Sequence, residues 1–187
     1  MTKIINYNFK KFNSFNSKEL KAANTVVKSG KLSEFLAGEL EGGKQVQKFE
    51  KSIKKYFNIK YAITLNSWTS GLIAAVGALD IEPGDEIIVS PWTMCATATA
   101  IVHWNCIPVF VDIEADTFCI DPKKIEAKIT VRTKAIIAVD IFGQSSDILK
   151  IKKIAKKYSL KVITDSAQSP GAKIKNFFVG TLGDIGG

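Results

Sequence analysis

The 187-residue chain contains one histidine and three cysteines, and this scarcity narrows its possible chemistry. His103 lies in a mostly apolar stretch with no cysteine or carboxylate at ligand spacing, so we predict no metal site and interpret it as a helix residue. Cys95, Cys106 and Cys119 form no CxxC pair. Their odd number favours reduced and mostly structural thiols.

Long hydrophobic runs are also lacking. No segment has the roughly 20 consecutive apolar residues that a bilayer-spanning helix needs. The start, MTKIINYNFKKFNSF, lacks the apolar stretch and the small-residue cleavage site of a signal peptide. We therefore expect a cytoplasmic protein with no membrane partner.

Arginine is nearly absent, because Arg132 is the only one among 26 basic residues, although the formal net charge is +8. The lysines are spread over the whole chain, and no nucleic-acid recognition motif accompanies them. In residues 147–158, apolar residues recur at helical spacing while lysines fall mainly on the other side. We interpret the charge as a solvated surface and predict no nucleic-acid partner.

The chain does contain an alternation of short apolar runs and helix-like segments. Helical periodicity predicts helices over 44–57, 69–79, 96–104 and 147–158. Strand-sized runs rich in β-branched residues occupy residues 61–65, 86–89, 108–111, 135–139 and 161–164. This order predicts an α/β fold with a mostly parallel sheet and flanking helices.

Ligands of open parallel sheets gather beyond the C-terminal ends of the strands, so the junctions after the apolar runs are candidates for chemistry. In NSWTSG (66–71), hydroxyl and N–H groups at a helix N-terminus suit a phosphate, or form a simple helix cap. In SPWTMCAT (90–97), the large side chains either cover a flat ring or pack ordinarily. In DSAQ (165–168), a carboxylate directly follows an apolar strand, as a helix cap or a functional group.

Together these junctions resemble the DegT/StrS-type (DegT/DnrJ/EryC/StrS) sugar aminotransferases, pyridoxal-phosphate enzymes of fold type I. The matching segments follow the family's order from about residue 29 to residue 187 and are SGKLSEF, VQKFEKSIKKYFNIKYAITLNSWTSGL, PGDEIIVSPWTMCATATAI, PVFVDIEADTFCIDP, TKAIIAVDIFGQSSD, KVITDSAQSPGA and VGTLGDIGG. The resemblance implies that 29–187 form the N-terminal part of an aspartate aminotransferase-like large domain, after an N-terminal segment over 1–28.

The same resemblance implies a site for pyridoxal 5′-phosphate (PLP). Trp68 and Thr69 match the turn that grips the cofactor phosphate, and Met94 matches a usually aromatic position against the pyridine ring. Asp165 matches the carboxylate that keeps the pyridine nitrogen protonated, which lets the ring accept electrons. Gln168 matches the residue that hydrogen-bonds the phenolic oxygen.

The sequence departs from the family's cofactor site in two respects. Asp140 stands where many family members have histidine, so its role is left open. The family's Schiff-base lysine lies beyond the GDIG motif, and no lysine of this sequence matches it. We therefore expect the C-terminal half of the domain to be absent and this chain not to transaminate. The partners of strands 61–65 and 161–164 are then expected in the absent half, which leaves the first strand orphaned and the second exposed as an edge.

The resemblance implies a parent enzyme that moves an amino group from an amino acid, typically glutamate, to a keto group of a nucleotide-linked sugar. Such homodimeric enzymes serve surface polysaccharide biosynthesis, including lipopolysaccharide. A related PLP-dependent sugar dehydratase, in which histidine replaces the lysine, is the close alternative. A non-catalytic truncated product, which binds cofactor or pairs with a full-length relative, is another alternative.

Overall fold

The computed structural model describes residues 14–32 and 42–187, and the chain divides into two compact units, Met1–Ile53 and Lys54–Gly187. In the first unit, α1 (Ser17–Ser29) begins with a reciprocal capping box between Asn16 and Glu19. It ends at Gly30, whose positive φ of 66° suits a residue without a Cβ. The predicted helix over 44–57 is confirmed as α2 (Lys44–Phe57).

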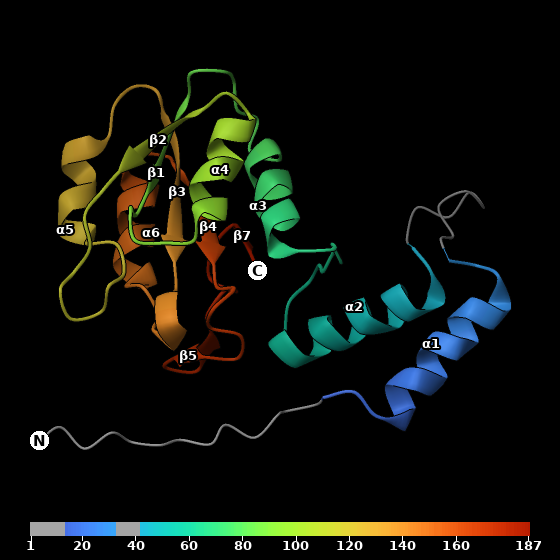
Figure 1. Ribbon diagram of the computed structural model, residues 1–187. Helices are drawn as coiled ribbons and strands as arrows, with labels where there is room; N and C mark the ends of the chain where they lie inside the picture. The colour runs from blue at the N-terminus through green and yellow to red at the C-terminus, as the bar shows by residue number, and fades with distance from the viewer. Residues whose placement is uncertain (1–13, 33–41) are drawn as a thin grey trace, which may run out of the picture. The chain divides into compact units, whose positions relative to one another are not determined.

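The second unit contains a five-stranded parallel sheet with the order β2-β1-β3-β4-β7 (Figure 1). Its strands are β1 (Glu86–Val89), β2 (Ile107–Phe110), β3 (Thr133–Val139), β4 (Lys161–Asp165) and β7 (Ile185–Gly186). A separate antiparallel hairpin pairs β5 (Lys173–Ile174) with β6 (Phe177–Phe178). The predicted mostly parallel sheet is therefore confirmed.

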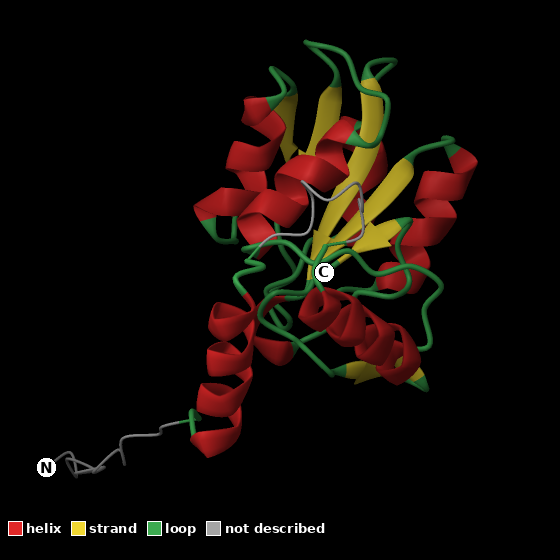
Figure 2. Cartoon of the chain, turned by 90° about the vertical axis from the view of Figure 1, so that its right-hand side faces the viewer, coloured by secondary structure: helices red, strands yellow, loops and turns green. Residues whose placement is uncertain are grey.

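Helices cover both faces of this sheet (Figure 2). One core joins α3 (Trp68–Gly77) and α4 (Cys95–His103) to one face, and includes Ile87 and Val89 of β1. The other core joins α5 (Pro122–Ile125) and α6 (Ile148–Lys157) to the opposite face, and includes Ile88. Because successive side chains of a strand point to opposite faces, strands covered on both sides are unbroken apolar runs.

The strand predicted over 61–65 is wrong, since these residues have no regular secondary structure. Tyr61 and Ile63 are 72% and 83% exposed. A strand is stabilised by its ladder to a neighbour, and no strand among the described residues pairs with this segment. Without a neighbouring strand to pair with in the described part of the chain, residues 61–65 remain irregular.

The expectation that the neighbour of β4 lies wholly outside this chain also needs correction. Ile163 and Thr164 pair in parallel with Ile185 and Gly186 of β7. Immediately after β4, the backbone N–H of Ser166 donates to the carbonyl oxygen of Gly187 at 2.7 Å. The C-terminal end of β4 is therefore covered on that side.

The remaining elements connect the sheet to its helices. Two 3₁₀ turns, Glu126–Lys128 and Ile141–Gly143, follow α5 and β3. Among the described helices none is both long and apolar enough to cross a membrane.

Candidate functional site

The sheet order creates a crevice at the C-terminal ends of β1 and β3. After β1 the chain passes through α4 on one face, whereas after β3 it passes through α6 on the other, so the two connections diverge. Such a switch point is the usual ligand site of an open parallel sheet. The crevice holds a cavity of about 140 Å³.

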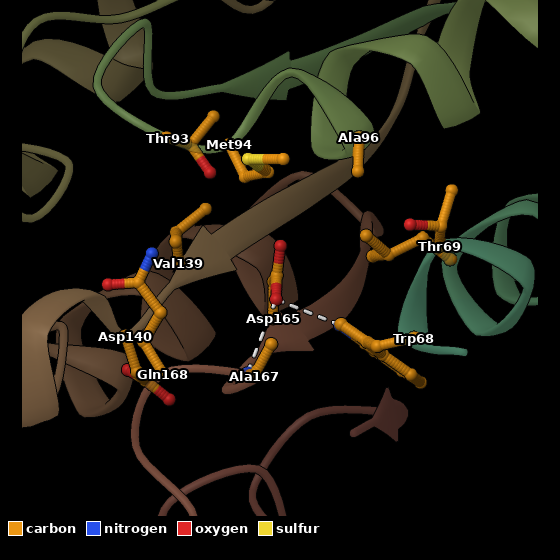
Figure 3. Close-up of a pocket in the computed structure, with 11 residues that line it drawn as sticks. Trp68, Thr69, Thr93, Met94, Ala96, Val139, Asp140, Asp165, Ala167 and Gln168 are labelled. Atoms are coloured by element: carbon orange, nitrogen blue, oxygen red, sulfur yellow. Dashed lines mark hydrogen bonds between the residues drawn. The ribbon is translucent and has the colours of Figure 1, made fainter. Parts of the chain in front are cut away.

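The lining of this cavity comes from the ends of β3 and β4 and from the N-terminal ends of α3 and α4 (Figure 3). It consists of Trp68, Thr69, Leu72, Thr93, Met94, Ala96, Val139, Asp140, Asp165, Ala167 and Gln168. The five residues for which the family resemblance implied a role toward the cofactor lie at one cavity: Trp68, Thr69, Met94, Asp165 and Gln168. None of the lining residues is a lysine.

Asp165, the last residue of β4, presents a carboxylate with neutral hydrogen-bond donors on both oxygens. Trp68 Nε1 donates to Oδ1 at 2.8 Å, as Figure 3 shows, and Thr97 Oγ1 donates to Oδ2 at 2.8 Å. The residue is only 6% exposed, and no lysine, arginine or histidine of the described chain forms an ion pair with it. The arrangement suits a cationic N–H from a ligand.

The N-terminus of α3 offers donors at the other side of the cavity. Ser67 caps the helix by accepting from the backbone N–H of Ser70 at 3.1 Å. The backbone N–H groups of Trp68 and Thr69 and the Thr69 hydroxyl donate to no atom within the described part of the chain. Free N–H groups and the positive end of a helix dipole together suit an anion.

Gln168 has an amide whose orientation is set by a backbone group. Its Oε1 accepts from the N–H of Phe142 at 3.1 Å, in the tight turn where Phe142 has a φ of 54°. With the oxygen engaged, the Nε2 group is the end left for a ligand. Gln168 can therefore serve a ligand as a donor.

Met94 lies just before α4 with 65% of its surface exposed. In the view of Figure 3 its side chain lies on the side of the cavity opposite Trp68 and Ala167. The neighbouring Trp92 is not among the lining residues and packs its ring against Phe118, with centroids 6.0 Å apart. Of these two large side chains, Met94 is the one available to a ring in the cavity.

Asp140, whose role the sequence left open, organises the loops around the cavity. Its Oδ1 accepts from the backbone N–H and the hydroxyl of Ser146 at 2.8 and 2.9 Å, and its Oδ2 accepts from the Ser166 hydroxyl at 2.6 Å. Burial raises the pKa of Asp140, although these hydrogen bonds act to lower it. The side chain ties the residues that follow β3 to those that follow β4.

Thr93 and Thr97 are site residues that the sequence analysis missed. Thr97 is fully buried on α4 and bridges Asp165 to the Thr93 hydroxyl, which lies 2.8 Å from its own. The available signal was a threonine among the apolar residues of CATATAIVH, where a buried hydroxyl needs a hydrogen-bond partner.

Comparisons with known proteins identify the family of the chain. The model of the DegT/DnrJ/EryC1/StrS aminotransferase family matches residues 15–187. The spore coat polysaccharide biosynthesis protein SpsC of Bacillus subtilis is 41% identical over 79% of this chain and 38% of its own length. The dTDP-3-amino-3,6-dideoxy-alpha-D-galactopyranose transaminase of Aneurinibacillus thermoaerophilus is 45% identical over 78% of this chain and 40% of its own length.

Solved structures give the same result. An aminotransferase from Psychrobacter cryohalolentis superimposes with a TM-score of 0.86 and 35% identity, over 94% of this chain and 43% of its own. The E. coli GDP-4-keto-6-deoxy-D-mannose-3-dehydratase with bound hydrated PLP superimposes with a TM-score of 0.81 and 28% identity, over 94% and 44%. The chain spans about two fifths of the length of the curated relatives it matches.

Proposed function

The chain belongs to the DegT/DnrJ/EryC1/StrS aminotransferase family, and we propose that it binds PLP as part of a sugar aminotransferase. The observation that carries the proposal is Asp165, a buried carboxylate with neutral donors on both oxygens and no cationic partner among the described residues. A protonated pyridine nitrogen would supply the missing positive charge. Asp165 would hold that proton at the ring nitrogen, where the bound cofactor provides an electron-accepting ring for bond changes at an amino-bearing carbon.

The other residues of the cavity fit the remaining parts of the cofactor. The free N–H groups of Trp68 and Thr69, with the Thr69 hydroxyl, would bind its phosphate. Gln168 would donate from Nε2 to the phenolic oxygen, because Phe142 already occupies Oε1. Met94 would cover one face of the ring and restrict access of water.

The full reaction needs a lysine, and the cavity lining contains none. We propose that this lysine belongs to sequence beyond residue 187 and that residues 1–187 alone bind cofactor without transaminating. The amino acceptor is proposed to be a keto group of a nucleotide-linked sugar, with an amino acid as donor. The support is that the Aneurinibacillus relative is named as a transaminase of a dTDP-linked amino sugar. A homodimer, a cytoplasmic location and a place in surface polysaccharide biosynthesis remain part of the same proposal.

The dehydratase alternative is supported by a specific comparison. The E. coli structure that superimposes with a TM-score of 0.81 is a GDP-sugar dehydratase with PLP. The two activities share the same cofactor-binding half, so the residue in place of the Schiff-base lysine separates them. Sequencing the transcript past the codon for Gly187 tests this directly, because a lysine supports the aminotransferase and a histidine supports the dehydratase.

The cofactor proposal is tested by binding to the purified 187-residue chain. Pyridoxamine 5′-phosphate is the suitable probe, because it lacks the aldehyde that would react with surface lysines. We expect saturable binding by titration calorimetry, with at least tenfold weaker binding of pyridoxamine, which lacks the phosphate. A folded chain that binds neither compound would overturn the proposed site.

A further inference from the structure

Asp165 is held from two different helices. Trp68, at the first position of α3, places Nε1 2.8 Å from Oδ1, and Thr97, in α4, places Oγ1 2.8 Å from Oδ2. The backbone N–H of Ala167 also donates to Oδ1, at 3.4 Å, and donors on both oxygens oppose rotation of the carboxylate about its terminal bond. Trp68 lies 97 residues before Asp165 in the sequence, and Thr97 lies 68 residues before it. Both contacts therefore depend on the packing of α3 and α4 against the sheet.

The direction of the hydrogen bonds on the threonine side follows from proton counting. A hydroxyl carries one hydrogen, and an ionised carboxylate can only accept. Thr97 therefore gives its hydrogen to Asp165, and Thr93, whose Oγ1 lies 2.8 Å from that of Thr97, must donate to Thr97. Bonds aligned in one direction polarise one another, so Thr93 strengthens the donor that faces Asp165.

The clamp leaves the charge of Asp165 available. Trp68, Thr97 and the backbone N–H of Ala167 are neutral donors, and together they occupy three acceptor positions of a carboxylate that has about four. They therefore stabilise a buried negative charge without neutralising it, as an ion pair would. The remaining acceptor position can bind a cationic N–H.

Trp68 contributes its backbone as well as its side chain to the cavity. Its backbone N–H is one of the free donors at the N-terminus of α3, while its indole N–H reaches Asp165. One residue thus connects the anion-binding end of the cavity to the carboxylate end. A ligand with a phosphate and a ring nitrogen at opposite sides would contact both ends.

We propose that Trp68 and Thr97 are positioning residues, which fix the Asp165 carboxylate for the ring nitrogen of a phosphorylated pyridine. The inference rests on the proposed PLP site and goes beyond it, because it assigns a role to the indole of Trp68 and to a residue outside the cavity lining. The two side chains act through Asp165 and need not touch the ligand.

The test compares Thr97→Val, which keeps the shape and removes the hydroxyl, with Thr97→Ser, which keeps the hydroxyl. The probes are pyridoxamine 5′-phosphate and its analogue with a C–H in place of the ring nitrogen. We expect Thr97→Val to raise the Kd of the first probe about tenfold and to leave that of the analogue within about twofold. Thr97→Ser should bind both probes as the wild type does.

Trp68→Phe gives an independent measurement with a matched control. It removes the indole N–H and should raise the Kd of pyridoxamine 5′-phosphate about fivefold, with little effect on the analogue. Trp104→Phe removes another indole hydrogen bond, that to the Ile73 carbonyl oxygen at 2.8 Å, outside the cavity. It should leave both dissociation constants within about twofold of the wild type. Circular dichroism establishes that each variant is folded.

The ligand-free chain supplies a further readout. The indole N–H resonance of Trp68 should shift in Thr97→Val and in Asp165→Asn, whereas that of Trp104 should not. Equal weakening of both probes by Thr97→Val, failure of Thr97→Ser to restore binding, or an unmoved Trp68 resonance in Asp165→Asn would overturn the clamp. A wild type that binds no probe would instead overturn the proposed PLP site and, with it, the role toward the ring nitrogen.

Discussion

The backbone N–H of Asp140 donates to the carbonyl oxygen of Asp165 at 2.8 Å, so two carboxyl residues lie side by side at the ends of β3 and β4. Their side chains have different surroundings. Asp140 receives three hydrogen bonds from Ser146 and Ser166. Asp165 is held by the side chains of Trp68 and Thr97 at the cavity. We interpret the first as an organiser of loops and the second as a ligand-binding group.

The first prediction concerns the stability that Asp140 contributes. Asp140→Ala leaves the Ser146 and Ser166 donors without their acceptor in a buried place, so the free energy of unfolding should fall by about 2 kcal/mol. Asp140→Asn should lose about half as much, because the amide oxygen can accept from Ser146 while the Ser166 hydroxyl turns to accept from the amide nitrogen. Urea denaturation measures both values. An alanine variant as stable as the asparagine variant would contradict this role.

The second prediction concerns how the stability difference between the wild type and Asp140→Asn changes with pH. Burial raises the pKa of Asp140 in the folded state, so the folded chain binds this proton more tightly than the unfolded chain. The contribution of this proton to the free energy of unfolding is therefore fully present below the unfolded pKa of roughly 3.9. It is lost as the pH rises through the pKa of Asp140 in the folded chain. The advantage of the wild type over Asp140→Asn should be larger at low pH than at neutral pH. Urea denaturation across this range, with an advantage that instead grows toward neutral pH, would contradict the sign.

Local sequence predicted most of the second unit because its elements have strong internal patterns. Ile87, Ile88 and Val89 form an unbroken apolar run because both faces of β1 are covered. The failed strand at 61–65 has a comparable run, and what it lacks is a paired neighbour, which no local pattern can supply. The helix α1 was not predicted, although Leu20, Ala23 and Val27 recur at helical spacing and the Asn16 capping box is present in its sequence.

The candidate site was predictable where chemistry follows directly from position along the chain. Asp165 ends a strand-sized apolar run, and Thr69 lies where an apolar run gives way to a helical pattern, so both could be selected before any fold was known. The bond between Trp68 and Asp165 could not be predicted in this way, because it spans 97 positions and depends on how α3 packs against the sheet. The role of Asp140 likewise depended on the Ser146 and Ser166 donors, which only the folded loops bring together.

The third prediction concerns the face of the cavity that Met94 provides. Met94→Ala removes most of the surface available to a bound ring, and the Kd of pyridoxamine 5′-phosphate should rise about fivefold. Met94→Phe supplies a flat aromatic face and should bind at least as tightly as the wild type. The matched control is Trp92→Ala, because Trp92 does not line the cavity. Titration calorimetry measures the Kd of pyridoxamine 5′-phosphate for each variant. Equal affinity of the wild type and Met94→Ala would show that Met94 does not contact the ring.

The fourth prediction separates the phosphate end of the cavity from the ring end. Thr69→Val removes a hydroxyl at the α3 N-terminus while keeping the shape of the side chain. It should raise the Kd of pyridoxamine 5′-phosphate about fivefold and leave the weaker binding of pyridoxamine unchanged, because only the first compound has a phosphate. Thr181→Val, outside the cavity, is the control. A Thr69→Val variant that weakens both ligands equally would contradict a phosphate role for this hydroxyl.

The fifth prediction tests one contact between α3 and α4 that lies outside the cavity. The Trp104 ring lies against Gly77, and its indole N–H donates to the Ile73 carbonyl oxygen of α3. A Cβ at Gly77 would overlap that ring, so Gly77→Ala should lower the free energy of unfolding by about 2 kcal/mol despite the better helix propensity of alanine.

Trp104→Phe should also destabilise the chain, because the Ile73 carbonyl loses its indole donor. The smaller ring leaves space beside residue 77, so the double variant should be more stable than the sum of the two single losses by about 1 kcal/mol. Urea denaturation of the four proteins measures this coupling. Strictly additive losses would mean that the glycine and the indole do not share a contact. The close approach of α3 and α4 would then need another cause.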